Sequence, residues 1–216
     1  MGIFTAIVEF FRDGGLFMYP ILFVGLGLAI AVERYTYLSV AGAKNRALWK
    51  KVVPLLKAGN FKQASEMTSR SKAAIGTVMS YGLYRISSAR RRDDIEKAMD
   101  ESLMEVLPRL EKRTHYLATF ANIATLLGLL GTIIGLIRAF TAVAAANPAE
   151  KADMLSASIS VAMNTTAFGL MVAIPLLLIH TVLQTKTNQI VDSLEMASVK
   201  FLNAITERRG DEGAPA

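Results

Sequence analysis

The sequence contains no cysteine, and its 216 residues include only two histidines, His115 and His180. The lack of cysteine excludes disulfides, redox dithiols and thiolate metal sites. The two histidines lie far apart in the chain and have no metal-ligand spacing. A Walker loop, an HExxH motif and a nucleophile elbow are also missing. We therefore predict that the protein is not an enzyme and holds no metal and no cofactor.

Charged residues are scarce as well. They make up 19% of the chain against 52% apolar residues, and the mean hydropathy is +0.37. Three long runs are almost free of charge: 14–32 has none, 116–147 is interrupted only by Arg138, and 154–185 has His180 as its only titratable group. As helices rising 1.5 Å per residue, all three can cross a hydrocarbon core. Lipid offers the backbone no hydrogen-bond partner, so these runs must be helical. The fold class predicted is an all-α membrane protein with three transmembrane helices and long cytoplasmic helical extensions.

The distribution of charge predicts the orientation in the membrane. The stretch 41–115 holds 16 basic and 8 acidic residues, whereas the segments before the first run and between the last two are net acidic. Because basic residues are enriched on the cytoplasmic side, we predict a multi-pass membrane protein with its N-terminus outside and its C-terminus in the cytoplasm. We expect no cleavage of the first run as a signal peptide, because Glu9 and Asp13 precede it with a single arginine.

The chain is thus divided into eight predicted segments. These are a periplasmic interfacial helix (1–13), the first transmembrane helix (14–38), a cytoplasmic helical loop (39–115), the second transmembrane helix (116–146), a periplasmic loop (147–153), the third transmembrane helix (154–184), a cytoplasmic helix (185–209) and a disordered tail (210–216).

The cytoplasmic part is expected to be helical. Breaks are predicted at Pro54, at Gly59–Asn60 and at Ser71. A longer helix is predicted to open at Asp93 and to continue into the second span. Beyond the third span, apolar residues recur every three or four positions and predict an amphipathic extension. Its stripe consists of Ile190, Leu194, Ala197, Phe201 and Ile205.

The basic loop does not have the pattern of a nucleic-acid site. Arg90, Arg91 and Arg92 are followed at once by Asp93 and Asp94, and no aromatic platform is interleaved with them. We expect no nucleic acid as a partner and anionic lipid headgroups as counter-ions.

Small residues mark a predicted helix contact. Gly128, Gly131 and Gly135 fall on one face of the second span, and Gly131 and Gly135 have the small-xxx-small spacing that lets membrane helices approach closely. In the third span, Gly169 lies on a narrow stripe of small residues that includes Thr166. We predict that these four glycines serve helix packing.

Polar side chains inside the spans are the candidate proton-pathway residues, namely Thr132, Thr166, Thr165 and Asn164. Two interpretations remain open for the threonines. Thr125, Thr132 and Thr166 can each bond back to the carbonyl four residues earlier, which needs no function. Alternatively, they line a narrow polar interior when several copies assemble. Asn164 is expected to hydrogen-bond a neighbouring helix.

Aspartate and glutamate are missing from the apolar stretch of every span. Proton transfer needs a group that takes up and releases protons, and hydroxyls do not do so at physiological pH. If this chain conducts protons, another protein must supply the carboxylate. Arg138 and His180 are interpreted as anchors at the membrane surfaces, and Pro175 is expected to bend the third span.

Two motifs on separate spans carry a family resemblance: GLLGTIIGLIRAF at 128–140 and SISVAMNTTAFGLMVAIPLLLIH at 158–180, after a first span ending in ERYTYL and a large basic loop. The chain resembles the ExbB/TolQ/MotA proton-channel family, and its ExbB/TolQ branch most. The resemblance implies a three-span subunit of the bacterial inner membrane with a periplasmic N-terminus. It also implies a ring-forming homo-oligomer, a pentamer, around the helices of an ExbD/TolR-like one-span protein. In such proteins the partner's membrane Asp carries protons, and the motor energises a TonB- or TolA-like protein.

By motif position, Thr132 and Thr166 match the family's channel-facing threonines. Several relatives of the ExbB branch carry a glutamate early in the third span, where this chain has Val161 or a neighbour of it. The leading hypothesis is a subunit of a motor driven by the proton-motive force, which serves outer-membrane transport or envelope maintenance. The competing hypothesis is a passive scaffold that holds partner helices and uses its threonines for packing.

Overall fold

The computed structural model describes residues 18–86 and 91–212. Within these ranges the chain is helical and contains no strand, which confirms the all-α prediction. The predicted interfacial helix lies outside the described residues, as does the end of the predicted tail. The helices are α2 (Met18–Ala58), α3 (Phe61–Ser69), α4 (Ala74–Ile86), α5 (Arg92–Glu111), α6 (Thr114–Ala145) and α7 (Lys151–Glu212).

Three of the described helices are long and apolar enough to cross a membrane, as predicted. These candidate spans lie within Phe23–Ala58, Thr114–Ala145 and Lys151–Thr206. Only 22%, 22% and 28% of their most apolar windows is buried within the chain. Most of the apolar surface therefore faces outward, as expected for helices that contact lipid or further helices.

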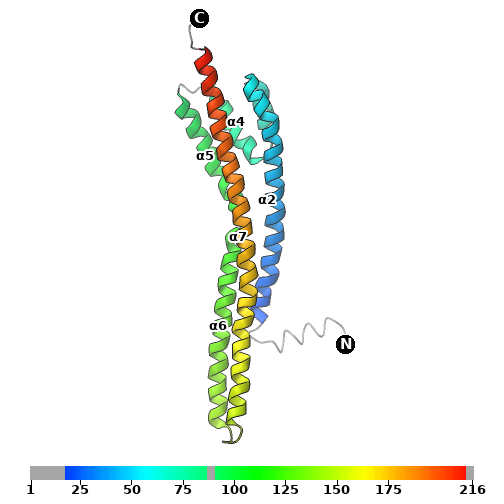
Figure 1. Ribbon diagram of the computed structural model, residues 1–216, viewed down its shortest axis with the longest axis vertical. Helices are drawn as coiled ribbons and strands as arrows, with labels where there is room; N and C mark the ends of the chain where they lie inside the picture. Colours follow the sequence, from blue (N-terminus) through cyan, green and yellow to red (C-terminus); the bar gives the residue numbers. More distant parts are fainter. Residues whose placement is uncertain (1–17, 87–90, 213–216) are drawn as a thin grey trace, which may run out of the picture. The chain divides into compact units, whose positions relative to one another are not determined.

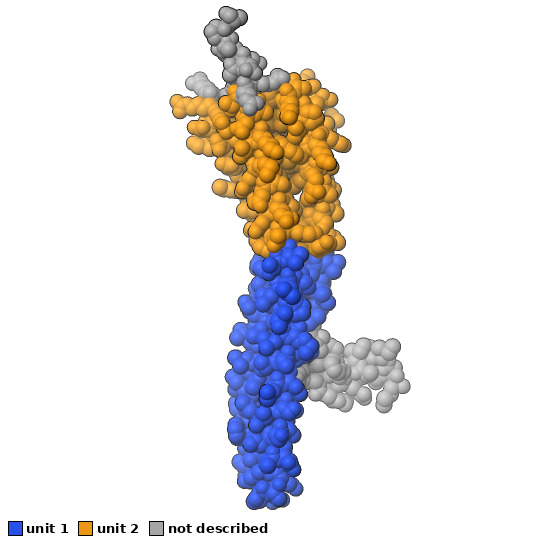
Figure 2. All heavy atoms as spheres, in the orientation of Figure 1, with its two compact units in different colours: residues 1–33, 113–182 blue, residues 34–112, 183–216 orange. Residues whose placement is uncertain are grey.

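The chain divides into two compact units, coloured separately in Figure 2. The first unit comprises residues 1–33 and 113–182, and the second comprises residues 34–112 and 183–216. In the first unit, α6 and the beginning of α7 run antiparallel, because only a short connection joins them (Figure 1). The second unit holds α3, α4 and α5 together with the remaining parts of α2 and α7.

The predicted apolar stripe on α7 forms the core of the second unit. Its five residues, from Ile190 to Ile205, are all buried, and Phe201 has no exposed surface. A Cβ added to Gly82 of α4 would lie 2.7 Å from Phe201 Cε1 and 2.8 Å from Met99 Sδ. Helix α4 is therefore packed directly against the side chains of both α5 and α7.

Two of the three predicted breaks in the loop are confirmed, and the break at Pro54 is wrong. Gly59 has a positive φ of 74°, and Asn60 caps α3 by accepting a hydrogen bond from the Gln63 backbone N at 3.2 Å. Helix α3 ends at Ser69 and α4 begins at Ala74, on either side of Ser71. At Pro54 the helix continues, because Val52 and Leu56 are buried beside it and hold this turn in place.

The predicted continuity between the long loop helix and the second span is also wrong. Helix α5 ends at Glu111, and Arg113 adopts the left-handed conformation with φ 64° before α6 begins. Two contacts fix this break. The guanidinium of Arg34, which is 2% exposed, donates a hydrogen bond to the Leu110 carbonyl and so satisfies one of the acceptors left free at a helix end. Within the first unit, Arg113 pairs with Glu33 at 2.9 Å.

Candidate functional site: a threonine pair between α6 and α7

Glycines bring the backbones of α6 and α7 into direct contact in the first unit. A Cβ added to Gly169 would lie 2.7 Å from the Ala124 carbonyl oxygen and 2.9 Å from Gly128 Cα. A Cβ added to Gly128 would lie 3.2 Å from Gly169 Cα and from the Thr165 carbonyl oxygen. Because the neighbouring atoms belong to the backbone, they cannot move aside as a flexible side chain can. An added methyl group at Gly169 would therefore force the helices apart, and one at Gly128 would require the backbone of α7 to give by a few tenths of an ångström.

The other two glycines of α6 face side chains of α7. A Cβ added to Gly131 would lie 2.9 Å from Cβ of Thr165, and one added to Gly135 would lie 2.9 Å from Cβ of Ala162. The structure thus places all four predicted packing glycines at the α6–α7 contact.

The close approach of the helices joins two hydroxyls from separate spans. Thr132 of α6 and Thr166 of α7 are hydrogen-bonded to each other through their Oγ1 atoms. Thr132 Oγ1 is also 3.3 Å from the Gly128 carbonyl of its own helix and 3.3 Å from the Ala162 carbonyl of α7. Thr166 Oγ1 donates to the Gly128 carbonyl at 3.2 Å.

This hydroxyl pair has more acceptors than hydrogens. Thr132 and Thr166 each carry one hydroxyl hydrogen, whereas the carbonyls of Gly128 and Ala162 and the two hydroxyl oxygens can all accept. The two hydroxyls can therefore exchange donor and acceptor roles by rotation alone. Both side chains are only half-buried, so a group at the surface of the helix pair can reach them.

The remaining candidate hydroxyls and the amide occupy different environments. Thr165 is buried against Gly131 and donates to the Ala162 carbonyl at 2.5 Å. Thr125 donates to the Ala121 carbonyl of its own helix at 3.1 Å, as the interpretation without a function expects. Asn164 is exposed, and the structure does not bring it to the threonine pair. Its expected bond to a neighbouring helix remains a prediction.

Sequence reasoning named the carbonyls of Gly128 and Ala162 as acceptors within their own helices and missed that each also accepts across the helix pair. A helical wheel places Thr132 about 100° from Gly131 and gives it no direct relation to α7. The signal was the equal spacing in the two helices, since Thr132 follows Gly128 by four residues and Thr166 follows Ala162 by four. Each threonine thus lies beside the carbonyl that the other can reach.

The charged and titratable residues singled out in the sequence differ in exposure. Glu33 is 47% exposed and pairs with Arg113, which is equally exposed. Arg138 is exposed, and His180 is half-buried. Val161, the residue at or beside the position of a glutamate in several relatives of the ExbB branch, is 54% exposed.

The long apolar helices define a multi-pass α-helical membrane protein. Residues 70–196 match the MotA/TolQ/ExbB proton channel family, which is more than half of the chain. The chain therefore belongs to this family, in agreement with the resemblance of its two motifs.

Individual relatives point to the ExbB/TolQ branch. The chain is 28% identical over 204 residues to a putative biopolymer transport protein ExbB homolog of Methanothermobacter thermautotrophicus. The matched region covers 89% of this chain and 68% of the relative. It is 34% identical over 94 residues to the Tol-Pal system protein TolQ of Haemophilus influenzae, covering 44% of this chain and 41% of TolQ. It is 34% identical over 121 residues to the biopolymer transport protein exbB1 of Vibrio cholerae, covering 54% of this chain and 51% of exbB1.

Proposed function

We propose that this chain is an ExbB/TolQ-like subunit of a motor in the bacterial inner membrane that is driven by the proton-motive force. Several copies, five by the family resemblance, form a ring around the transmembrane helices of an ExbD/TolR-like one-span protein. The motor energises a TonB- or TolA-like protein for outer-membrane transport or envelope maintenance.

The hydrogen-bonded pair of Thr132 and Thr166 is the observation that carries this proposal. Two hydroxyls that can exchange donor and acceptor roles can accept a hydrogen bond from a protonated group on one side and donate one to an acceptor on the other side. They cannot hold the charge themselves, because hydroxyls do not ionise at physiological pH. The partner's membrane Asp supplies the titrating group, and the threonines position and solvate it.

The energy available to such a subunit is sufficient for mechanical work. One elementary charge that crosses the membrane releases about 2.3 kcal/mol per 100 mV. The transfer of several protons per cycle therefore supplies free energy of several kcal/mol, which is available for mechanical work.

The test is the Thr132→Ala, Thr166→Ala double variant in cells that depend on this subunit. We expect loss of energised transport with normal amounts of the assembled complex in the membrane, because helix packing rests on the glycines. Full activity in this variant would remove the pathway role of the two threonines.

The alternative function, a passive scaffold for partner helices, is separated by Thr166→Val. This change keeps the volume of the side chain and deletes the hydroxyl. A scaffold tolerates it, whereas a motor subunit loses activity. Thr125→Val is the matched control, because the Thr125 hydroxyl bonds to the Ala121 carbonyl of its own helix.

A further inference from the structure

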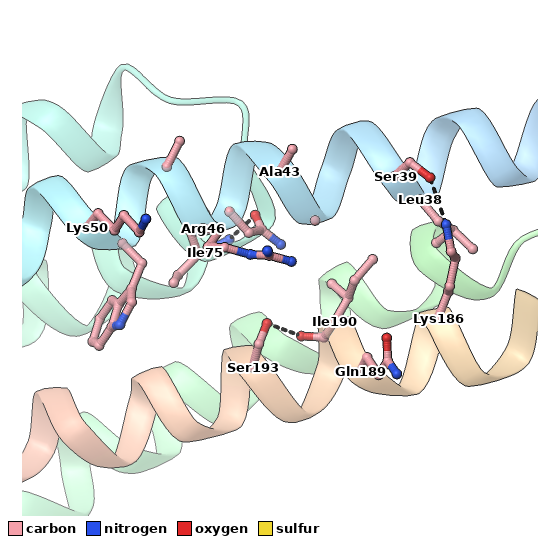
Figure 3. A pocket seen from close by; sticks show the side chains of 14 residues that line it. Leu38, Ser39, Ala43, Arg46, Lys50, Ile75, Lys186, Gln189, Ile190 and Ser193 are labelled. Carbon is pink, nitrogen blue, oxygen red and sulfur yellow. Dashed lines mark hydrogen bonds between the residues drawn. The ribbon is translucent and has the colours of Figure 1, made fainter.

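The second unit contains a cavity between α2 and α7, closed at one side by Ile75 of α4 (Figure 3). Its volume is about 530 Å³, within the usual range for small-molecule sites. Residues 38–50 of α2 and 186–193 of α7 supply the other lining side chains. All of these residues belong to the same compact unit.

The lining of this cavity is cationic. It includes Arg46, Lys50 and Lys186 and contains no aspartate or glutamate. None of the three cations forms an ion pair with a carboxylate in the part of the chain that the structure describes. Lys186 is held in place by neutral groups, since its Nζ donates to Ser39 Oγ at 2.9 Å and lies 3.5 Å from the centre of the Tyr35 ring.

A buried amide in the same lining lacks a hydrogen-bond acceptor. Asn45 is 3% exposed, and its Oδ1 accepts a hydrogen bond from the Ile75 backbone N at 3.2 Å. This bond fixes the orientation of the amide, so Nδ2 is the group left to donate. Nδ2 has no partner within the chain. A buried donor without an acceptor is unfavourable, and an oxygen-bearing ligand in the cavity removes that cost.

We propose that this cavity binds the phosphate group of an anionic phospholipid, with Asn45 Nδ2 donating to a phosphate oxygen and Arg46, Lys50 and Lys186 balancing its charge. Guanidinium and ammonium groups together with a neutral amide donor match the chemistry of a phosphodiester.

The position of the cavity in the sequence favours a lipid over a soluble phosphate. Leu38 and Ser39 follow the first apolar run within about two helical turns, and Lys186 directly follows the third. Trp49, which also lines the cavity, is a residue type enriched at membrane surfaces. Apolar side chains such as Leu38 and Ile190 offer contacts to the glycerol backbone and the first acyl carbons.

Binding is measured on the purified full chain by native mass spectrometry and by thermal unfolding in nanodiscs. Phosphatidylglycerol, phosphatidylcholine and inorganic phosphate are compared. We expect discrete binding of phosphatidylglycerol with an affinity about tenfold or more above that for phosphatidylcholine. Both lipids carry the phosphodiester, but the choline of phosphatidylcholine brings a positive charge toward Arg46, Lys50 and Lys186, whereas phosphatidylglycerol has a net negative charge. Inorganic phosphate is expected not to compete. Competition by phosphate at equal concentration would overturn the assignment to a lipid.

Three variants locate the site. Arg46→Gln with Lys186→Gln, and separately Asn45→Asp, are expected to abolish the preference for phosphatidylglycerol. The matched control is Lys44→Gln with Lys200→Gln, which removes the same charge from the same two helices at exposed positions outside the cavity lining. Helix content by circular dichroism identifies a variant that fails to fold. The other cavity variant then shows whether the cavity residues are needed for the preference for phosphatidylglycerol.

Equal loss in the control would mean that general charge attraction, rather than this cavity, holds the lipid. No preference for the anionic lipid in the unmodified chain would also overturn the proposal and would direct attention to an acidic protein segment as the occupant. None of these measurements needs motor activity, so their outcome is independent of the proposed function.

Discussion

The hydroxyl of Thr166 donates a hydrogen bond to the main-chain carbonyl of Gly128, 3.2 Å away on the other helix of the pair. The same carbonyl lies 3.3 Å from the hydroxyl of Thr132. One backbone oxygen therefore serves both threonines. The hydroxyl at position 166, rather than its methyl group, makes this connection.

Thr166→Ser is expected to retain energised transport, because serine keeps the donor and acceptor and loses only a methyl group. Transport is compared in cells that express Thr166→Ser or Thr166→Val at equal levels. Equal loss in both variants would show that packing by the methyl group, and not hydrogen bonding, is what position 166 contributes.

Gly169→Ala is expected to destabilise the α6–α7 pair by about 1–3 kcal/mol, because the new methyl group meets the Ala124 carbonyl oxygen and Gly128 Cα. Thermal unfolding in detergent measures the change. Gly25→Ala is the control, since a Cβ there has nothing within 4 Å. We expect this control to be neutral or slightly stabilising. A comparable loss in both variants would contradict the close backbone contact.

Phe201→Ala is expected to destabilise the second unit by about 3–5 kcal/mol, because the ring has no exposed surface and lies against Gly82. The matched control is Met196→Ala on the same helix. Met196 is 57% exposed, so its truncation is expected to change the free energy of unfolding by less than about 0.5 kcal/mol. Limited proteolysis of the second unit reports the difference, and equal resistance of the two variants to the protease would argue against this core.

Arg34→Met is expected to loosen the last turn of α5 and to cost about 1.5–3 kcal/mol, because the Leu110 carbonyl loses a charged donor in a buried place. Hydrogen exchange of residues 107–113 measures the effect. Arg109→Met is the comparison, since that side chain is 69% exposed and pairs with Glu105 at 3.3 Å. Unchanged exchange in Arg34→Met would show that other contacts end the helix.

The sequence was sufficient for features that depend on periodicity and composition. Three apolar runs predicted three membrane-length helices, and the stripe from Ile190 to Ile205 predicted the buried face of α7. Both features depend on which residues of a helix are excluded from water, and this can be read from the residues of that helix alone.

Features decided by contacts between distant residues were not predictable in this way. Pro54 was expected to end a helix, but its buried neighbours keep the turn intact. No glycine marks the break at Arg113 in the sequence. The conformation of Arg113 depends on contacts with residues far away in the chain, including Glu33. The hydrogen bonds from Thr132 to the Ala162 carbonyl and from Thr166 to the Gly128 carbonyl depend on how closely the two helices pack, which the spacing within each helix does not determine.

The contact between Gly128 and Gly169 leaves no room for a channel between α6 and α7 at this level of the helix pair. With backbone atoms this close, neither water nor an ion fits between α6 and α7. On the proposed function, a proton route along this chain therefore follows the outer edge of the helix pair, where Thr132 and Thr166 are half-buried, and not the seam between the two helices.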